Sequence, residues 1–375
     1  MTLATDETTA ELLHASPLAG KLYTDPAIFR REVDEIFGGL WLCAGREEAV
    51  PRPGDFLVRD LGDESIVVSR AEDGRLHAFY NVCRHRGARL LTEERGEGRR
   101  HFVCPYHAWT YGLDGQLQQA PLMADRPDFR CEHFPLVGLP VESWLGFFFL
   151  HLGGSGQEPP RALAEQVRDL PDLGDYDLPD LRVGARETYR VKANWKMLCE
   201  NYAECYHCSL VHPQLHRISH FLSGGKQESA DSFVGGPMKL RPGFDTMSLS
   251  GVSERGSLPG VRPEEHDLVR YYNVYPNFLI SLHRDYVLTH TLWPLSPGET
   301  WIECEWLFHP DEMARPGFDP ADAVEFWDVT NRQDWDVCER VQLGVRSRGY
   351  QPSRYQAGET CVYAFDQWYR ERMGL

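Results

Sequence analysis

The sequence predicts an α+β protein: an all-β segment comes first, and an antiparallel sheet with flanking helices follows it. Three observations lead to this prediction. Residues 40–155 contain several strand-like runs, some of them paired around Asp-Gly turns. Three longer strand-like runs with short turns lie between residues 271 and 308. A helical spacing of apolar residues then covers residues 321–346.

With 375 residues, the chain is long enough for two ordinary domains or one large domain. It carries 39 Lys and Arg against 56 Asp and Glu, which gives a net charge of −17. This balance argues against nucleic acid and anionic membranes as main partners, because both need a basic protein surface. Hydrophobic residues at 42% and aromatic residues at 12% are typical of a globular chain rather than a disordered one.

The start of the chain lacks the features of an export signal. No Lys or Arg precedes Lys21, whereas a signal peptide has a basic start. The most apolar run, residues 144–150, is too short to span a bilayer. We therefore expect a cytoplasmic protein that keeps its ten cysteines reduced.

Turn residues mark the elements of the β segment. Residues 65–69 and 76–80 flank Asp73-Gly74, which is a hairpin signal. A second pair of runs flanks Asp114-Gly115. The Gly- and Pro-rich residues 153–160 are typical of a linker, so the segment is expected to end there.

The pattern changes beyond the linker. Residues 191–212 look helical, and Pro213 is expected to end this helix, because the residue before a proline is pushed out of the helical region. Residues 221–262 are rich in Gly, Ser and Pro, which predicts a long loop or lid. An antiparallel meander is predicted from the strand-like runs at 271–282, 286–294 and 300–308.

Two Cys/His pairs stand at the turns of the β segment. Cys83 and His85 form a C-x-H pattern, and Cys104 and His107 form C-x-x-H. A short gap lets a Cys and a His converge from one loop tip, so the two loops offer two thiolates and two imidazoles. This set suits either one tetrahedral zinc ion or a Rieske [2Fe–2S] cluster, in which the thiolates bind one iron and the imidazoles the other.

A second group of metal-ligand residues lies near the expected end of the 191–212 helix. His207 and His212 are five residues apart, and in an unbroken helix their side chains would diverge by about 140°. They need a local irregularity to converge, and Pro213 offers one. Two histidines and a carboxylate form the facial triad that binds Fe(II) and leaves positions open for O₂ and substrate.

The periodicity of the 321–346 helix indicates which carboxylate completes that triad. The mostly apolar stripe along one face of this helix consists of Ala323, Trp327, Thr330, Asp334, Cys338, Val341 and Val345. Within the stripe, the charge of Asp334 is costly unless it is paired or bound to a metal. Asp336 lies on the opposite, charged face and is the weaker candidate. The alternatives are a buried salt bridge for Asp334 and a place in the core or at a helix end for His207 and His212.

These motifs resemble those of Rieske-type non-haem iron oxygenases. Arg-His-Arg-Gly at 84–87, Pro-Tyr-His at 105–107 and Trp109 match the Rieske domain of that family, although Ala108 stands where many members carry Gly. The run from Glu200 to His212, with Asp334 further on, is similar to the catalytic α subunit of the ring-hydroxylating oxygenases.

The resemblance runs from about residue 30 to 365 and implies a domain organisation. An all-β Rieske [2Fe–2S] domain, residues 41–155, would be inserted in a helix-grip-like catalytic domain with an antiparallel sheet, residues 156–375. An N-terminal segment, residues 1–40, would pack on the catalytic domain. Members assemble as homotrimers, in which the cluster of one subunit reduces the mononuclear iron of its neighbour.

The resemblance also implies roles for individual residues. The [2Fe–2S] cluster would be bound by Cys83, His85, Cys104 and His107, and the mononuclear Fe(II) by His207, His212 and Asp334. Glu204 occupies the position of an acid that links a cluster histidine of one subunit to an iron-ligand histidine of the next. Glu204 followed by Cys205-Tyr-His-Cys208 is similar to the branch that acts on betaines, choline and carnitine.

The expected activity is that of a Rieske mono- or dioxygenase, an oxidoreductase that uses O₂ and electrons from a separate NAD(P)H-dependent reductase of the ferredoxin or flavin type. Hydroxylation of an N-methyl carbon gives a hemiaminal that loses formaldehyde, so N-demethylation of a small quaternary ammonium compound is expected. The alternative in the same class is an aromatic-ring hydroxylating α subunit. The alternative of another class is a Rieske electron carrier or a zinc-stabilised binding protein, although a carrier needs no second metal.

Aromatic rings are expected to hold a quaternary ammonium group through cation–π contacts. The candidates are Tyr202, Tyr206, Tyr272, Phe278 and Trp293, although an aromatic residue in a helix or strand is more often part of the core. Cysteines 199, 205 and 208, near the iron motif, are expected to be small buried residues rather than ligands.

Overall fold

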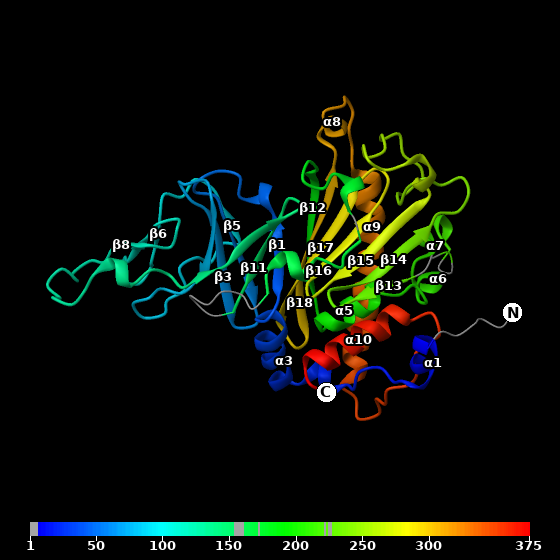
Figure 1. The fold of residues 1–375 in the computed structure, drawn as a ribbon, viewed down its shortest axis with the longest axis horizontal. Coiled ribbons are helices and arrows are strands. Elements are labelled where there is room, and N and C mark those ends of the chain that lie inside the picture. Colours follow the sequence, from blue (N-terminus) through cyan, green and yellow to red (C-terminus); the bar gives the residue numbers. More distant parts are fainter. Residues whose placement is uncertain (1–6, 154–160, 172, 221–222, 224–226) are drawn as a thin grey trace. The chain divides into compact units, whose positions relative to one another are not determined.

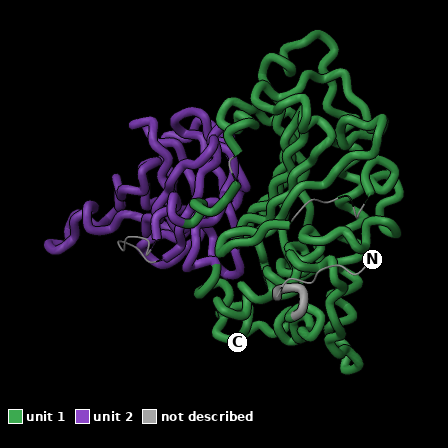
Figure 2. The backbone as a smooth tube through the Cα atoms, turned by 45° about the vertical axis from the view of Figure 1, so that its right-hand side comes forward, with its two compact units in different colours: residues 1–36, 166–375 green, residues 37–165 purple. Residues whose placement is uncertain are grey.

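The structure is a computed structural model of the chain and describes residues 7–153, 161–171, 173–220, 223 and 227–375. The chain divides into two compact units, which Figure 2 colours separately. Unit 1 comprises residues 1–36 and 166–375, and unit 2 comprises residues 37–165. None of the described helices has a stretch long and apolar enough to cross a bilayer.

Unit 2 is built from strands in three small antiparallel sheets. The five-stranded sheet has the order β5-β2-β3-β4-β9, and the three-stranded sheets have the orders β1-β11-β10 and β6-β7-β8. The strands are β1 (Trp41–Arg46), β2 (Phe56–Leu61), β3 (Glu64–Arg70), β4 (Leu76–Tyr80), β5 (Arg95–Gly96), β6 (Phe102–Val103), β7 (Thr110–Tyr111), β8 (Leu117–Gln119), β9 (Gly138–Leu139), β10 (Val141–Trp144) and β11 (Phe147–His151).

Both Asp-Gly turns predicted for this unit are present. β3 pairs with β4 around Asp73-Gly74, and β7 pairs with β8 around Asp114-Gly115. The two turn glycines have φ angles of +78° and +79°, which a residue with a Cβ adopts only with strain. Cys83 and Cys104 lie in the hydrophobic core of the unit, so each Cys/His loop is anchored there at its first ligand.

Unit 1 is built on a seven-stranded antiparallel sheet with the order β12-β18-β17-β16-β15-β14-β13 (Figure 1). The strands are β12 (Arg182–Val191), β13 (Glu228–Ala230), β14 (Phe233–Lys239), β15 (Leu268–Val274), β16 (Phe278–Leu282), β17 (Val287–Ser296) and β18 (Glu299–Phe308). From β13 to β18 each strand pairs with the next one in the chain. The predicted antiparallel meander is therefore confirmed and is longer than predicted.

Two details of that prediction are wrong. The single strand expected at 271–282 is two strands, β15 and β16, because Pro276 lies between them and lacks the N–H that would continue a ladder. The loop or lid expected at 221–262 contains β13 and β14. Within that range, residues 221–222 and 224–226 lie outside the described residues.

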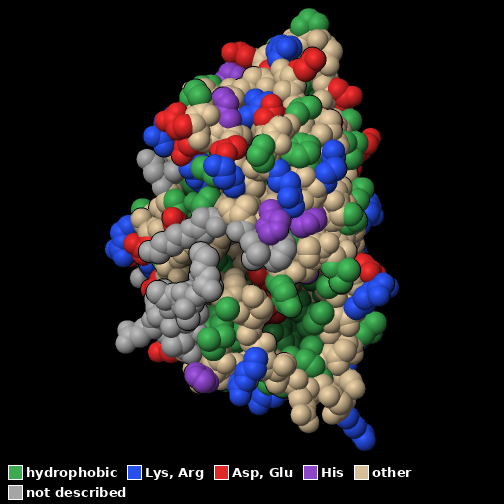
Figure 3. Space-filling view, turned by 90° about the vertical axis from the view of Figure 1, so that its right-hand side faces the viewer, with side chains coloured by type: hydrophobic (Ala, Val, Ile, Leu, Met, Phe, Trp, Pro, Cys, Tyr) green, Lys and Arg blue, Asp and Glu red, His purple; other side chains and the backbone are tan. Residues whose placement is uncertain are grey.

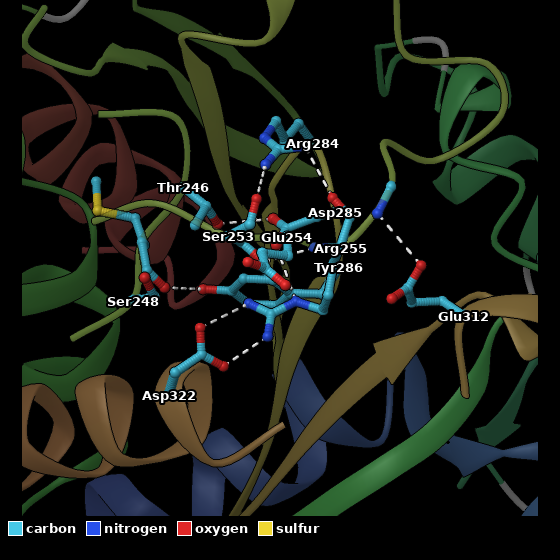
Figure 4. A network of polar contacts seen from close by, with 12 residues as sticks. Thr246, Ser248, Ser253, Glu254, Arg255, Arg284, Asp285, Tyr286, Glu312 and Asp322 are labelled. Carbon is cyan, nitrogen blue, oxygen red and sulfur yellow. Dashed lines mark hydrogen bonds and ion pairs between the residues drawn. The ribbon is translucent and has the colours of Figure 1, made fainter. Parts of the chain in front are cut away.

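A buried network of charges fixes residues 241–262 (Figure 4). Arg255 Nε donates to Asp285 Oδ2 at 3.0 Å, and the two terminal nitrogens of Arg255 donate to Asp322. Arg284 donates to backbone carbonyls of the same segment. The partners come from the β16–β17 turn and from a helix far along the chain, which is why local periodicity does not reveal the order of this segment.

The chain has ten helices of α type among the described residues. They are α1 (Glu7–His14), α2 (Lys21–Thr24), α3 (Pro26–Glu32), α4 (Leu163–Gln166), α5 (Trp195–Tyr202), α6 (Cys208–Val211), α7 (Pro213–Ile218), α8 (Pro310–Met313), α9 (Ala321–Val345) and α10 (Thr360–Arg372). The helix predicted at 321–346 is confirmed as α9. α9 packs against α5 and β12, so it joins the helical layer to the sheet.

The helix predicted at 191–212 is wrong in its extent. Residue 191, the first of the predicted helix, is the last residue of β12. The helix α5 begins after Asn194, whose side chain accepts a hydrogen bond from Lys196 N. Residues 203–207 are not helical. The helix end predicted before Pro213 is present, because α6 ends at Val211 and His212 is not helical. Pro213 also begins α7, since a proline at the first helical position loses no intrahelical hydrogen bond.

Glu32 of α3 ties the N-terminal helices to α5 and α10. Glu32 and Lys196 are fully buried, with 2.6 Å between Oε1 and Nζ. Trp195 Nε1 and Tyr369 Oη also donate to the Glu32 carboxylate, at 2.9 and 2.7 Å. Both carboxylate oxygens therefore have partners, which offsets the cost of burying the charge.

We predict that Lys196→Met destabilises the protein far more than the loss of a surface ion pair. The change leaves the Glu32 charge buried without its cation, which costs about 3–5 kcal/mol. The control, Lys239→Met, removes an exposed ion pair with Asp267 and should cost about 0–1 kcal/mol. Urea unfolding followed by tryptophan fluorescence measures both, and equal losses of unfolding free energy would contradict the assignment.

Candidate metal centres and active site

The two Cys/His pairs of unit 2 each sit in a tight turn. The N–H of Gly87 donates to the Cys83 carbonyl, and the N–H of Ala108 donates to the Cys104 carbonyl, both at 3.0 Å. Ala108 has a φ of +55°, which is a left-handed conformation that favours glycine. A glycine would therefore serve equally well at this position, so the alanine does not disturb the turn that presents the ligands.

These turns bring two imidazole rings together. His85 Nδ1 and His107 Nδ1 are 3.1 Å apart, and both side chains are exposed. Trp109 stacks on His85 with 4.9 Å between ring centroids. Although His107 is exposed, loss of some solvent around its ring, and then the nearby His85, lower its pKa, which favours the neutral imidazole that binds metal.

The two cysteines are the buried half of this group. Cys83 and Cys104 are each 2% exposed, and their sulfur atoms lie within hydrogen-bond reach of each other. Tyr111 Oη is 3.4 Å from Cys83 Sγ. Two paired nitrogens and two paired sulfurs fit a [2Fe–2S] group that has a nitrogen-bound end and a sulfur-bound end.

In unit 1, the three predicted iron ligands come together from separate elements. His207 precedes α6, His212 lies between α6 and α7, and Asp334 belongs to α9. Asp334 Oδ1 is 2.9 Å from His212 Nε2 and 3.3 Å from His207 Nε2. The residues between the two histidines are helical, and the chain leaves helical geometry at His212, whose φ and ψ are −119° and +74°, so the irregularity lies beside Pro213 as predicted.

The group is organised around one positive charge. Burial opposes that charge, but hydrogen bonds to Asp334 and Glu204 raise the pKa of His207 to about 10. Burial also acts to raise the pKa of Asp334, but hydrogen bonds from His207 and His212 outweigh it and lower that pKa. A metal cation bound by the same nitrogen and oxygen atoms would take the place of the proton.

Polar side chains hold the outer nitrogen of each ring. His212 Nδ1 is 2.8 Å from Gln333 Oε1, which also accepts from Gln214 Nε2 at 2.8 Å. His207 Nδ1 is 2.5 Å from Glu204 Oε1. Both rings are thus oriented through Nδ1, and Nε2 is left for a metal.

Sequence reasoning missed both glutamines. The available signal is their position in the chain, since Gln333 precedes Asp334 and Gln214 follows His212 by two residues. Asp336, the weaker candidate ligand, has a side chain that is 61% exposed and pairs with Arg340 at 2.8 Å. Of the two aspartates, the structure brings Asp334 to the histidines.

The three side chains face a cavity of about 160 Å³. Its aromatic wall contains Tyr202, Tyr271 and Trp327, with ring centroids 6.1 Å apart for the two tyrosines and 6.3 Å apart for Tyr271 and Trp327. Apolar side chains of α7 and β14 line another part. On the face that carries α6 and α7, hydrophobic side chains gather around a hollow (Figure 3).

Of the five aromatic candidates, the structure brings Tyr202 to this cavity. Its hydroxyl is 2.8 Å from Ser281 Oγ. Tyr206 is 61% exposed on the non-helical segment. The remaining three are buried in the sheet and do not line the described cavity: Tyr272, Phe278 and Trp293.

Tyr271 and Trp327 were missed by sequence reasoning. Successive side chains on a strand point to opposite faces, and one strand alone does not reveal whether Tyr271 or Tyr272 faces the cavity. Trp327 carried a clearer signal, because it lies seven residues before Asp334 on the same helical stripe, two turns away.

Cys205 and Cys208 form a disulfide on either side of His207 in the chain. The expectation that all cysteines are reduced is therefore wrong for this pair, because the turn after α5 brings their α-carbons to 4.9 Å. Cys208 Sγ lies within 4.8 Å of ligand atoms of His207 and His212. A disulfide sulfur is not a thiolate, so the donor set remains two imidazoles and a carboxylate. Cys199 is buried, as expected.

Two domain families match the chain. Residues 40–136 match the Rieske [2Fe-2S] domain, and residues 178–375 match the ring hydroxylating alpha subunit (catalytic domain). The glycine betaine monooxygenase oxygenase subunit of Pseudomonas aeruginosa (strain UCBPP-PA14) is 33% identical over 97% of this chain and 92% of its own length. The carnitine monooxygenase oxygenase subunit of Escherichia coli (strain K12) is 36% identical over 89% of this chain and 85% of its own.

Solved structures share the fold. The quaternary ammonium Rieske monooxygenase CntA matches with a TM-score of 0.81 over 99% of both chains, at 24% identity. Naphthalene 1,2-dioxygenase from Rhodococcus sp. matches with a TM-score of 0.77 over 98% of this chain and 97% of its own, at 19% identity. Given both domain matches and relatives that are similar along nearly the whole chain, the protein belongs to the Rieske-type ring-hydroxylating oxygenase α-subunit family, and it is a non-haem iron oxygenase with a [2Fe–2S] cluster and a mononuclear iron.

Proposed function

We propose that this oxygenase hydroxylates an N-methyl group of a small quaternary ammonium compound such as a betaine. The observation that carries the proposal is the aromatic wall of Tyr202, Tyr271 and Trp327 beside the two histidines and Asp334. A quaternary ammonium group has no N–H to donate, so aromatic faces and nearby negative charge are the protein groups that attract it. Glu204 and Asp334 supply that charge at the same cavity.

The names of the relatives support the same substrate class. Those that match most of the chain are named as monooxygenases of glycine betaine and carnitine. A choline monooxygenase of Arabidopsis thaliana is 28% identical over 94% of this chain and 82% of its own length. All three compounds carry a trimethylammonium group, which is the part that an aromatic wall recognises.

We infer the metal ligands from the two donor sets. The [2Fe–2S] cluster is bound by Cys83, His85, Cys104 and His107, and the mononuclear iron by His207, His212 and Asp334. When bound, these groups supply electrons one at a time and activate O₂ for attack on a C–H bond. Gln333 and Glu204 hold the histidine rings in the orientation that directs Nε2 toward Asp334.

Electron transfer between the centres is proposed to cross a subunit boundary in a homotrimer. His85 and His107 are exposed on loop tips of unit 2, and Glu204 is half-buried beside His207 in unit 1, so each is accessible to another copy of the chain. A quaternary ammonium Rieske monooxygenase is described as showing inter-subunit electron transfer. In this arrangement Glu204 hydrogen-bonds a cluster histidine of the neighbouring subunit.

The proposed reaction needs a separate NAD(P)H-dependent reductase as electron source. One turnover consumes O₂, two electrons and two protons, inserts one oxygen atom into a C–H bond of the N-methyl group to give N–CH₂OH, and releases the other oxygen atom as water. The hydroxymethyl ammonium product then loses formaldehyde and a proton and leaves a tertiary amine. The product pair of formaldehyde and tertiary amine distinguishes this reaction from ring hydroxylation.

We predict substrate-dependent O₂ uptake with a betaine, carnitine or choline in the presence of a reductase, and formaldehyde equal in amount to the O₂ consumed. Dimethylbutanol, the neutral carbon isostere of choline, is the matched control and should bind at least about tenfold more weakly, because it lacks the cation–π contribution. A cis-diol or phenol formed from a small aromatic compound, without uptake on any quaternary ammonium, would overturn the substrate class.

We predict that Asp334→Ala abolishes turnover and lowers the iron content from about three to about two atoms per chain, because two irons belong to the cluster and one to the facial triad. The visible absorption of the cluster should be unchanged. Asp336→Ala is the control, since its side chain is exposed, and it should retain iron and activity. Full turnover by Asp334→Ala would remove this residue from the site.

We predict that Glu204→Gln slows oxidation of the reduced cluster in a single turnover by about 10–100-fold while both metals stay bound, because the amide orients the histidine without carrying the charge. Stopped-flow absorbance with substrate and O₂ measures this rate. Glu264→Gln, whose parent side chain is 67% exposed, is the control. A normal rate in Glu204→Gln would show that electrons reach the iron without this carboxylate.

A further inference from the structure

A second cavity adjoins the active site. It has a volume of about 270 Å³ and lies among α5, α9, α10 and residues 350–359. Asn201 and Glu204 line both this cavity and the first one, so these two side chains stand between them. Apart from Glu204, the proposed mechanism uses no side chain of the second cavity.

Two carboxyl groups meet in the wall of this cavity. Glu200 on α5 and Asp366 on α10 both line the cavity, and their carboxyl groups lie within hydrogen-bond reach of each other. Asp366 is fully buried and Glu200 is half-buried. Ionised carboxylates only accept hydrogen bonds, so the contact requires one proton shared by the pair.

Each carboxyl group of the pair also accepts a hydrogen bond from a tyrosine hydroxyl group. Tyr23 Oη donates to Glu200 Oε1 at 2.7 Å, and Tyr355 Oη donates to Asp366 Oδ2 at 2.5 Å. The other oxygen of Asp366, Oδ1, is buried and has no side-chain hydrogen-bond partner among the described residues, while burial raises the pKa of the Asp366 carboxyl and the backbone N–H of Leu18 acts to lower that pKa. A proton held between the carboxyls is the partner that satisfies it.

The positive charges nearby are engaged with other groups. Lys196 pairs with Glu32 at 2.6 Å, and Arg370 donates to the Ser16 carbonyl at 2.9 Å. Burial raises the pKa of both carboxyls of the pair. The other titratable groups that line the cavity are Glu204, Cys338, Tyr350 and Glu359. None of these is a cation, so the surroundings favour a pair that carries one proton at neutral pH.

Glu359 provides a connection toward solvent. It is half-buried just before α10, and burial raises its pKa. A cavity of this volume has room for several water molecules, and the carboxyl groups in its wall can hydrogen-bond to them, so the waters can carry protons between these groups. The cavity thus joins Glu359, the carboxyl pair and the side of Glu204 in one continuous space.

We propose that Glu200 and Asp366 form a proton reservoir that supplies the active site through the second cavity, past Asn201 and Glu204. The proposal rests on the proposed oxygenase reaction, in which O₂, two electrons from the reductase and two protons convert N–CH₃ to N–CH₂OH and water. The pair releases its proton toward the developing water, and Glu359 passes a replacement from solvent. Glu200 and Asp366 act through the cavity rather than on substrate, so they are positioning residues for the proton.

The first test needs no substrate. Infrared spectra of the intact wild-type protein at neutral pH should show a carbonyl band of a protonated carboxylic acid that shifts in D₂O. Asp366→Asn and Glu200→Gln should each remove this band, and the exposed control Asp336→Asn should keep it. Absence of the band from the wild-type protein would overturn the proposal whether or not any quaternary ammonium compound is a substrate.

A milder variant covers the case in which the two carboxyl variants fail to fold. Tyr355→Phe keeps the ring but removes the hydroxyl that donates to Asp366. Since that bond favours the ionised form, its loss should move the pH midpoint of the band upward. An unmoved midpoint would mean that the band belongs to another carboxyl group.

The second test separates proton supply from a structural role. With any substrate that supports O₂ uptake, Asp366→Asn should lower turnover at least about tenfold. It should also raise the solvent deuterium isotope effect, make turnover fall at a lower pH than in wild type, and divert O₂ to hydrogen peroxide. The proposal would be overturned if folded, iron-loaded Asp366→Asn kept the wild-type pH dependence, the wild-type isotope effect and the wild-type ratio of product formed to O₂ consumed.

Discussion

The convergence of two imidazoles on one carboxylate oxygen is the constraint on which the active site depends. Asp334 projects from α9, where an isolated charge would be costly, and the two histidines reach it from a segment that is helical on both sides of a short break. The break is needed because five helical residues would direct the rings apart. Glu204 and Gln333 then fix the rings from behind, so the donor set is preorganised for a cation rather than assembled around it.

One helical turn at the end of α5 serves both cavities. Consecutive residues of a helix point about 100° apart, so neighbours in sequence reach different spaces. Glu200 joins the buried carboxyl pair, Asn201 stands between the cavities, and Tyr202 forms part of the aromatic wall. Glu204, just beyond the helix, contacts His207, a proposed iron ligand, and also lines the second cavity. In the proposed function, a few adjacent residues therefore orient a metal ligand, form the substrate wall and lead to the proton reservoir.

Much of the fold followed from local chemistry. Asp-Gly pairs predicted two hairpins, because glycine alone takes the required positive φ without strain, and apolar spacing predicted α9 and the antiparallel meander. The errors fell where local signals conflict with distant partners. Pro213 follows the end of α6 and begins α7, but nothing in its local signal reveals that the predicted 191–212 helix is interrupted at residues 203–207. Residues 241–262 have little periodicity, yet Arg255 fixes them through Asp285 and Asp322, which lie far along the chain.

The sequence by itself determined the kinds of ligand atom, since thiolates, imidazoles and a carboxylate at short spacings limit the metals that can bind. It also placed Asp334 on an apolar stripe, because helical periodicity is a property of one segment. Only the tertiary structure decided which rings face the cavity and which glutamines hold the histidines, because those contacts join segments that are distant in the chain, such as His212 and Gln333. The Glu200–Asp366 contact is of the same kind. The Cys205–Cys208 disulfide is local, but it depends on the turn that brings the two α-carbons to 4.9 Å, and the spacing of the cysteines does not reveal that turn.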